Sequence, residues 1–257
     1  MIKPMRFLRS PYIALFISCA LLFAIPLFAW GIHWSWNAND QSALLWWFYL
    51  LTQTVSKPFG FITSALMLFV LIYTLNIRRG EWLKFALVML LPVIVGQVAV
   101  SEIKKTNQEP RPYVVWLSQT DTEIGRHFYQ DAPVQRQQLI TQRLANNTQI
   151  PDWQKQHWLQ QVDPAFPSGH TIFAATWALM AVALLVARGK WLLAGVIMLW
   201  AYGVIISRLA LGMHWPGDLF TSIMIALYLS LPAVWWWLRW RSAGLNASAT
   251  AGPSSRR

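Results

Sequence analysis

Eight residues in three separate blocks of the sequence can bind an anion and move protons. In chain order they are Lys104, Arg111, Ser168, Gly169, His170, Arg208, His214 and Asp218. Arginine presents a planar fork of N–H donors that matches phosphate oxygens, and lysine supplies a compact positive charge. Three such cations set against one carboxylate predict a pocket with net positive charge, suited to binding phosphate.

The middle block, Pro167-Ser168-Gly169-His170, has the composition of a helix start. Ser168 suits the N-cap of the apolar helix that follows, and Gly169 lets the backbone approach a ligand closely. A helix N-terminus with a serine hydroxyl and free N–H groups is a favourable site for phosphate. Taken alone, this tetrapeptide is equally consistent with an ordinary turn and cap.

The two histidines of these blocks have different neighbours, which predicts different roles. His214 precedes Asp218 by four residues, so the carboxylate can accept one imidazole N–H and leave the other nitrogen nucleophilic. His170 lies beside the predicted phosphate site, where an imidazole with an ordinary pKa of about 6.5 can protonate a leaving oxygen. Each histidine alone is also consistent with a hydrogen-bond donor at a membrane interface. A metal site of two histidines and an aspartate is the competing interpretation, but the neighbouring cations would repel a metal ion.

The composition places these blocks in an integral membrane protein. The chain has 257 residues, of which 56% are hydrophobic and 12% charged, against about 25% charged in soluble domains. We therefore expect an all-α fold, a six-transmembrane-helix bundle. A further apolar stretch, 43–51, is too short to span and predicts an interfacial helix or a buried shoulder, in preference to a re-entrant loop. The six predicted spans, each near the required length of about 20 residues, are 11–30, 58–77, 85–103, 171–187, 191–211 and 219–238.

Charge in the short loops predicts the orientation of the spans. Basic residues collect near the N-terminus, at 78–84 and 188–190, and after the last span, so this side and both termini are expected in the cytoplasm. Spans three and five then run outward and spans four and six inward, which brings all eight residues to one external face. Residues 1–242 form the predicted membrane domain, and the small, polar tail 243–257 is expected to be disordered.

The long polar segment 104–166 is then an extracytoplasmic, partly helical segment between the third and fourth spans. Short helices are predicted near 134–144 and 151–162, and Trp153 and Trp158 are expected to rest the segment on the membrane surface as a partial lid. The remaining histidines are expected to be solvated or interfacial: His33, His127 and His157.

Together the three blocks resemble the signature of the type 2 phosphatidic acid phosphatase superfamily. The surrounding residues, the six spans and the long external segment are most similar to the bacterial phosphatidylglycerophosphatases of that superfamily. Lys105 falls outside the pattern and is expected to be a surface charge. The matching strings are Lys104-x6-Arg111-Pro112, Pro167-Ser168-Gly169-His170 and Ser207-Arg208-x5-His214-x3-Asp218.

The resemblance implies a role for each of the eight residues. His214 would be the nucleophile that forms a phosphohistidine, Asp218 would orient it, and His170 would be the acid for the leaving group. No metal and no other cofactor is implied. The groups implied to hold the phosphate oxygens are Lys104, Arg111, Ser168, Gly169 and Arg208.

The resemblance also implies a substrate class and a location. The expected activity is hydrolysis of phosphatidylglycerophosphate to phosphatidylglycerol and phosphate, with undecaprenyl diphosphate, phosphatidic acid and diacylglycerol diphosphate as further substrates. The expected location is the bacterial inner membrane, with the active site facing the periplasm and the lipid bilayer as partner, without nucleic acid or an obligate protein partner. Two alternatives remain open: a lipid phosphotransferase, which would share every catalytic residue, and a non-enzymatic anion-binding or transport protein.

Overall fold

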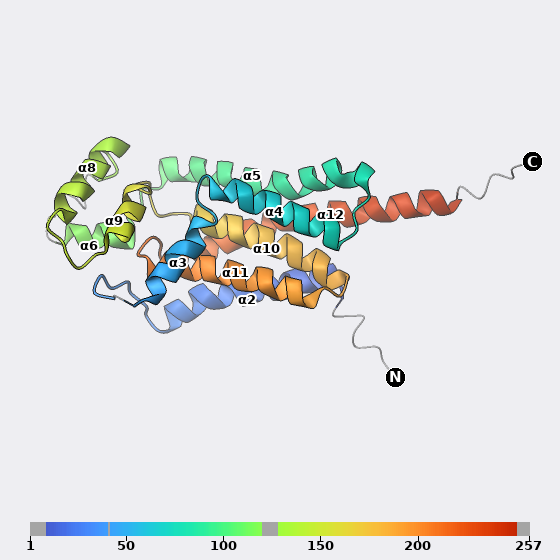
Figure 1. The fold of residues 1–257 in the computed structure, drawn as a ribbon, viewed down its shortest axis with the longest axis horizontal. Helices are drawn as coiled ribbons and strands as arrows, with labels where there is room; N and C mark the ends of the chain where they lie inside the picture. Colours follow the sequence, from blue (N-terminus) through green and yellow to red (C-terminus); the bar gives the residue numbers. More distant parts are fainter. Residues whose placement is uncertain (1–8, 41, 120–127, 251–257) are drawn as a thin grey trace, which may run out of the picture.

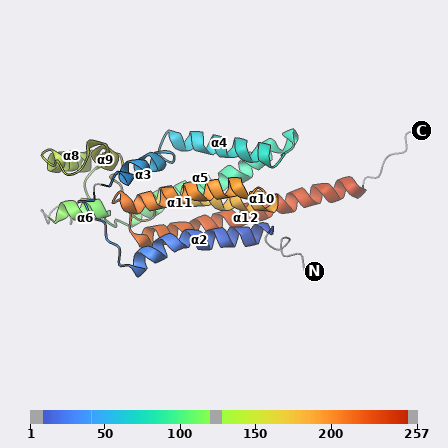
Figure 2. The same ribbon diagram turned by 60° about the horizontal axis from the view of Figure 1, so that its bottom comes forward.

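The computed structural model describes residues 9–40, 42–119 and 128–250, with side chains up to Ser242. All regular structure in these ranges is helical. The long helices lie alongside one another in a bundle, and three short helices, α6, α8 and α9, gather at one end of it (Figures 1 and 2). The helices are α2 (Pro11–Gly31), α3 (Leu44–Gln53), α4 (Phe59–Thr74), the 3₁₀ turn η1 (Arg79–Glu81), α5 (Trp82–Thr106), α6 (Pro112–Ser118), α8 (Pro133–Leu144), α9 (Asp152–Leu159), α10 (Gly169–Ala187), α11 (Trp191–Ala210) and α12 (Pro216–Thr250).

Helix α10 is the centre of the bundle. Every residue from Thr171 to Val186 is buried, and the helix contacts α2, α4, α5, α11 and α12. A helix that is apolar on all sides has to be surrounded by other helices or by lipid. Its alanines leave little side-chain volume between the backbones, which suits close helix packing in a membrane. The buried alanines are Ala174, Ala175, Ala178, Ala181 and Ala183.

Within the described part of the chain, five helices are long and apolar enough to cross a membrane, in agreement with five of the predicted spans. They are Pro11–Gly31, Arg79–Thr106, Gly169–Ala187, Trp191–Ala210 and Pro216–Ser242. The sixth prediction, 58–77, corresponds to α4, which is apolar but only 16 residues long. It ends at Thr74 because Asn76 has a positive φ of 50°, a conformation that does not continue a right-handed helix. Helix length therefore supports five spans and leaves the sixth a prediction.

The stretch predicted as an interfacial helix or buried shoulder is helix α3, which packs on α11. Gly203 of α11 permits the close approach, because a Cβ atom there would lie 2.7 Å from the Leu51 side chain. On its other side Trp46 meets Trp153 of α9 with ring centroids 5.5 Å apart. The helix therefore bridges the bundle and the short helices at its end.

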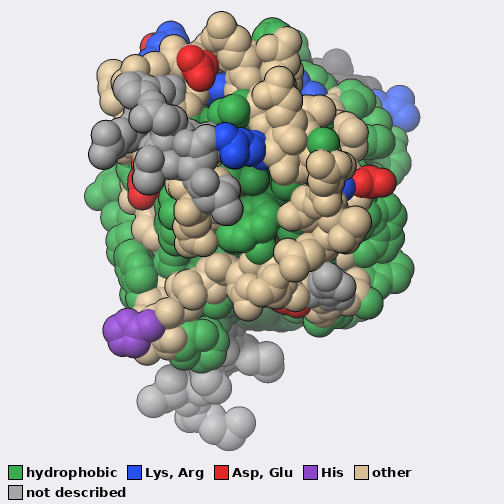
Figure 3. Space-filling view, turned by 90° about the vertical axis from the view of Figure 1, so that its left-hand side faces the viewer, with side chains coloured by type: hydrophobic (Ala, Val, Ile, Leu, Met, Phe, Trp, Pro, Cys, Tyr) green, Lys and Arg blue, Asp and Glu red, His purple; other side chains and the backbone are tan. Residues whose placement is uncertain are grey.

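Residues 104–166, called the cap here, carry the predicted short helices as α8 and α9. Their buried apolar side chains form a second hydrophobic core together with Ala38, Leu45, Leu211 and Met213 from outside the cap. The cap covers one end of the bundle, and Figure 3 shows polar side chains and backbone over much of this face, with hydrophobic side chains between them and along the flanks. Few charged side chains appear in the same view. The buried side chains of the cap core include Tyr113, Val114, Leu117, Phe128, Ile140, Leu144, Ile150, Trp158 and Val162.

The expectation that Trp158 rests on the membrane surface is wrong. Trp158 is fully buried, stacks on Tyr113 with ring centroids 4.8 Å apart, and donates from Nε1 to the Leu211 carbonyl at 3.0 Å. The next residue, Gly212, has a φ of 70° and lies against Trp36, where a Cβ atom would be 2.6 Å away. These contacts tie the cap to the loop between α11 and α12, which carries His214.

Helix α12 runs on to Thr250, so it does not end at residue 243, where the sequence predicts a change to disorder. Ala243, Ala247 and Ala249 have high helix propensity, which is compatible with this extension. The last seven positions of the predicted tail, 251–257, lie outside the described residues.

Candidate active site

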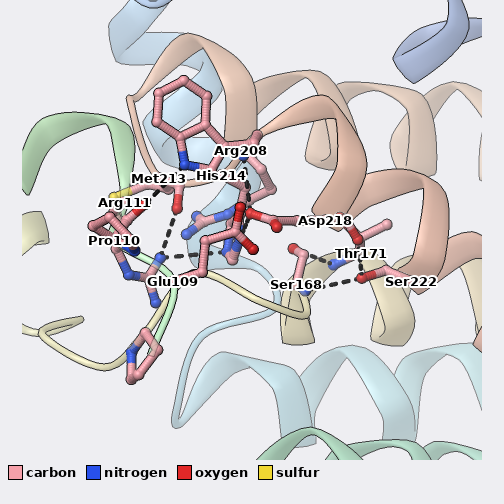
Figure 4. Close-up of polar contacts among 12 residues, drawn as sticks. Glu109, Pro110, Arg111, Ser168, Thr171, Arg208, Met213, His214, Asp218 and Ser222 are labelled. Atoms are coloured by element: carbon pink, nitrogen blue, oxygen red, sulfur yellow. Dashed lines mark hydrogen bonds and ion pairs between the residues drawn. The ribbon is translucent and has the colours of Figure 1, made fainter. Parts of the chain in front are cut away.

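All eight predicted residues lie on helix ends and loops at the cap end of the bundle, and Figure 4 labels five of them. Five of them are almost completely buried, with side chains at most 1% exposed, although all five are polar or charged. A polar cluster buried in this way needs partners for every group, so each contact constrains what the site can do. The five residues are Arg111, Ser168, Arg208, His214 and Asp218.

His214 and Asp218 form the hydrogen-bonded pair that their spacing predicts. Nδ1 of His214 is 3.1 Å from Oδ2 of Asp218, which also accepts the Trp215 backbone N–H at 2.9 Å. Pro216 begins α12, so Asp218 lies in the first turn, where a negative charge is favourable. The Arg208 carbonyl accepts the backbone N–H of His214 at 3.1 Å and thereby fixes the loop.

The contacts of His214 define which nitrogen is available for chemistry. Nε2 lies 3.3 Å from Nη1 of Arg111, and a guanidinium can only donate. Nε2 therefore carries a lone pair, and Nδ1 carries the hydrogen that Asp218 accepts. Burial and then the charges of Arg111 and Arg208 lower the pKa of His214 well below its usual value. His214 is thus a neutral imidazole that donates from Nδ1 to Asp218 and directs the Nε2 lone pair at Arg111.

Ser168 is the N-cap of α10, as predicted, and its Oγ accepts the Thr171 backbone N–H at 3.3 Å. Its own N–H is not free, because it donates to Oγ of Ser222 at 2.9 Å. Ser222 in turn donates to the Asp218 carbonyl at 2.6 Å, so the start of α10 is connected to the start of α12. Among the described residues, the backbone N–H groups at this helix start that have no partner are those of Gly169 and His170.

Lys104 and Arg111 share a carboxylate that the sequence interpretation missed. Asp163 of the cap pairs with Lys104 through Oδ2 and accepts from Nη2 of Arg111 at 2.8 Å through Oδ1. Its carbonyl accepts from Nε of Arg111 at 2.7 Å. Burial alone raises the pKa of Asp163, but Arg111 and Lys104 outweigh it and hold that pKa well below its usual value. The two cations therefore already bind one anionic group from the same chain.

Arg208 differs from the other two cations because its hydrogen-bond partners in the described part of the chain are all neutral. Nη1 donates to Thr52 Oγ1 at 2.5 Å and Nη2 to Gln161 Oε1 at 2.7 Å. Nε has no hydrogen-bond partner among the described residues, and none of their carboxylates forms an ion pair with this side chain. A buried cation without a counter-charge is costly, which makes this guanidinium a favourable position for an anion.

His157 is buried beside Arg208, so its predicted solvated or interfacial position is wrong. Its Nε2 lies 3.4 Å from Nη1 of Arg208 and its exposed fraction is 1%. Burial, then the charges of Arg208 and Arg111, lower its pKa. A signal was present in the sequence, because Gln154, His157 and Gln161 recur at helical spacing and share one face of α9 and its extension.

His170 lies in the first turn of α10, and Oγ of Ser56 is 3.1 Å from its Nε2. The Gly169 carbonyl accepts from Nε2 of Gln97 at 3.1 Å, which holds the turn against α5. Lys105 pairs with the exposed Glu102 at 2.7 Å, in agreement with its predicted place outside the site. Of the other histidines, His33 is exposed and His127 lies outside the described residues.

The described residues contain no group of three or more histidine, cysteine, aspartate or glutamate side chains that could hold a metal ion. The polar groups that converge here are cations, imidazoles and hydroxyls, together with the carboxylates of Asp163 and Asp218. Such a set can bind and stabilise an oxyanion, and the Nε2 lone pair of His214 lies among these cations.

Comparisons with known proteins point to a phosphatase family. Residues 81–242 match the family model described as the PAP2 superfamily, a range that includes all eight predicted residues. The chain is 39% identical over 220 residues to phosphatidylglycerophosphatase B of Escherichia coli (strain K12), which covers 85% of this chain and 86% of that protein. It is 35% identical over 214 residues to phosphatidylglycerophosphatase B of Haemophilus influenzae, covering 80% and 88% respectively.

Proposed function

This chain belongs to the PAP2 superfamily, and we propose that it hydrolyses phosphatidylglycerophosphate to phosphatidylglycerol and phosphate through a phosphohistidine. Undecaprenyl diphosphate, phosphatidic acid and diacylglycerol diphosphate are proposed as further substrates. The observation that carries the proposal is the buried His214–Asp218 pair, in which the unprotonated Nε2 of His214 lies 3.3 Å from Nη1 of Arg111. A neutral imidazole next to phosphate-binding cations is the arrangement that nucleophilic attack on phosphorus requires.

In the proposed first step, Nε2 of His214 attacks phosphorus while the bond from phosphorus to the lipid oxygen breaks. Asp218 holds the imidazole in the required tautomer and stabilises the positive charge that develops on it, as in other carboxylate–histidine pairs. His170 gives a proton to the departing lipid oxygen. Water then cleaves the nitrogen–phosphorus bond, which releases inorganic phosphate and restores both histidines.

The phosphate oxygens are proposed to be held by Lys104, Arg111, Ser168, Gly169 and Arg208. Uncatalysed hydrolysis of a phosphate monoester is among the slowest of known reactions, so the site has to lower its barrier by roughly 20 kcal/mol or more. Fixed cations can do this without a metal ion, because they neutralise the oxygens that Mg²⁺ neutralises in kinases. We therefore propose metal-independent turnover.

The proposed location is the bacterial inner membrane, with α4 as a sixth span, both termini in the cytoplasm and the active site facing the periplasm. The basic loops at the end of the bundle opposite the cap support this orientation. A mostly apolar cavity of about 340 Å³ lies between α3 and α4, next to the turn that carries Ser56, and it offers a position for part of the lipid chain. It is lined by Leu50, Gln53, Thr54, Phe59, Ile62 and Thr63.

The test is phosphate release by the purified protein in detergent with EDTA present. Phosphatidylglycerophosphate and undecaprenyl diphosphate are compared, with His214→Ala as the inactive variant and the exposed His33→Ala as the matched control. The proposal predicts release that survives EDTA, needs His214 and is unchanged in the His33 variant. Loss of release in EDTA, or substantial release by His214→Ala, would contradict it. Transfer of labelled phosphate to an acceptor lipid without free phosphate would identify a phosphotransferase instead.

A further inference from the structure

Two hydroxyl side chains outside the family match reach into the site. Residues 81–242 match the family model, whereas Thr52 and Ser56 come from α3 and the turn that follows it. Thr52 accepts from Arg208 at 2.5 Å, and Ser56 Oγ lies 3.1 Å from Nε2 of His170. A part of the chain that the family model does not cover therefore contacts both the buried arginine and the histidine proposed as the acid.

The turn that carries Ser56 is held on several sides. The Ser56 backbone N–H donates to Gln53 at 3.0 Å, and its carbonyl accepts from the Gly60 N–H at 2.9 Å. Neighbouring Thr54 accepts from Nε1 of Trp200 in α11 at 3.0 Å, and its carbonyl accepts from the Thr63 hydroxyl at 2.6 Å. The Ser56 hydroxyl is thus fixed relative to α4 and α11 before it meets His170.

The hydroxyl of Ser56 can form a chain of two hydrogen bonds that supports a charged imidazole. It lies 3.1 Å from Nε2 of His170 and 3.3 Å from the Thr52 carbonyl. A hydroxyl accepts and donates at the same time, so Nε2–H can donate to Oγ while the hydroxyl hydrogen points to the carbonyl. With both hydrogen bonds pointing away from the ring, the imidazolium form of His170 is stabilised. Nδ1 is then the nitrogen that exchanges its proton with the substrate.

We propose that Ser56 is a positioning residue for His170, which fixes its Nε2 and thereby directs its Nδ1–H to the leaving lipid oxygen. Ser56 itself transfers no proton to the substrate and does not contact phosphorus. The inference rests on the proposed function, because it assumes that His170 acts as the acid in phosphate ester cleavage.

The test uses the dependence of the reaction on its leaving group. A lipid alkoxide needs a proton as it departs, whereas p-nitrophenolate leaves without one, so only the first substrate depends on the acid. The quantity compared is kcat/KM, which reports phosphoryl transfer and excludes the later hydrolysis of the phosphohistidine. For Ser56→Ala we expect kcat/KM to fall about tenfold or more with phosphatidylglycerophosphate and to change by less than about twofold with p-nitrophenyl phosphate.

Two further variants separate positioning from a general structural effect. Ser56→Thr keeps the hydroxyl and is expected to retain most of the activity on the lipid. Ser64→Ala removes a matched hydroxyl, which bonds to the Gly60 carbonyl four residues earlier at 2.9 Å, and should leave both substrates unaffected. An equal fall on both substrates in Ser56→Ala, or no fall on the lipid, would overturn the inference.

His170→Ala distinguishes failure of this inference from failure of the proposed function. It is expected to show the same selective loss on the lipid, larger than that of Ser56→Ala. If His170→Ala lowers kcat/KM equally on both substrates, or on neither, the acid role of His170 in the proposed function is wrong. If His170→Ala lowers kcat/KM selectively on the lipid and Ser56→Ala does not, only the role of Ser56 is wrong.

Discussion

Replacing Asp163 by alanine removes the carboxylate that pairs with two of the three cations proposed to bind phosphate. Oδ1 accepts from Arg111 at 2.8 Å, and Oδ2 pairs with Lys104. If the phosphate of a substrate binds the same guanidinium and ammonium groups, it has to displace this carboxylate. We therefore expect the Asp163→Ala variant to bind inorganic phosphate more tightly than the native protein.

The magnitude follows from how exposed the three side chains are. The Asp163 side chain is 49% exposed, whereas those of Arg111 and Lys104 are 1% and 11% exposed. Half-exposed ion pairs are screened, so about 1 kcal/mol is appropriate for each of the two pairs. The displaced carboxylate regains part of this free energy through hydration. The net cost of displacing it is then about 1.4 kcal/mol, which corresponds to about a tenfold change in phosphate affinity.

The assay is the inhibition constant of inorganic phosphate, measured as product inhibition of lipid hydrolysis. Asp152→Ala is the matched control, because Asp152 is also a cap aspartate, is 93% exposed and pairs with Lys155 at 3.2 Å away from the site. Asp163→Asn keeps the shape of the side chain and should shift the constant in the same direction. An inhibition constant that is unchanged or higher in both Asp163 variants would refute the reasoning.

Three further results are expected. Asp218→Asn should lower kcat by about 10³- to 10⁴-fold with little change in KM, since it disturbs the tautomer of His214; a change confined to KM would contradict that role. Burial and the charge of Arg111 keep the pKa of His214 low, so its Nε2 stays unprotonated as the pH falls. After correction for ionisation of the substrate, kcat/KM should therefore not fall to half its plateau value as the pH is lowered to about 6.5, the pKa of an ordinary histidine. Thr52→Val removes an acceptor from buried Arg208 and should raise KM roughly tenfold, whereas an unchanged KM would show that this hydroxyl does not position the arginine.

The sequence was sufficient to find the residues whose places depend on short spacing and helix ends. His214 and Asp218 lie four residues apart across a helix start, so their contact follows from local geometry. Ser168 caps α10 for the same reason. The apolar runs predicted the bundle, because length and hydropathy alone decide whether a helix can span.

Contacts between distant parts of the chain were not accessible in this way. The Arg208–Thr52 bond joins residues 156 apart, and the Arg111–Asp163 pair joins residues 52 apart. Neither contact follows from local spacing; each depends on how α3 and the cap fold onto the bundle. The buried position of His157 was missed although Gln154, His157 and Gln161 share one face of α9 and its extension, because a polar helix is interpreted as solvated until the surface that it covers is known.

The most direct test of the central proposal is to trap the covalent intermediate. The purified protein is mixed with phosphatidylglycerophosphate, quenched under alkaline conditions in which phosphohistidine survives, digested and mapped by mass spectrometry. We predict a phosphoryl group on His214, more of it when hydrolysis is slowed, and none in His214→Ala. A phosphoryl group on another residue, or turnover that continues in His214→Ala, would contradict the role of His214 as nucleophile.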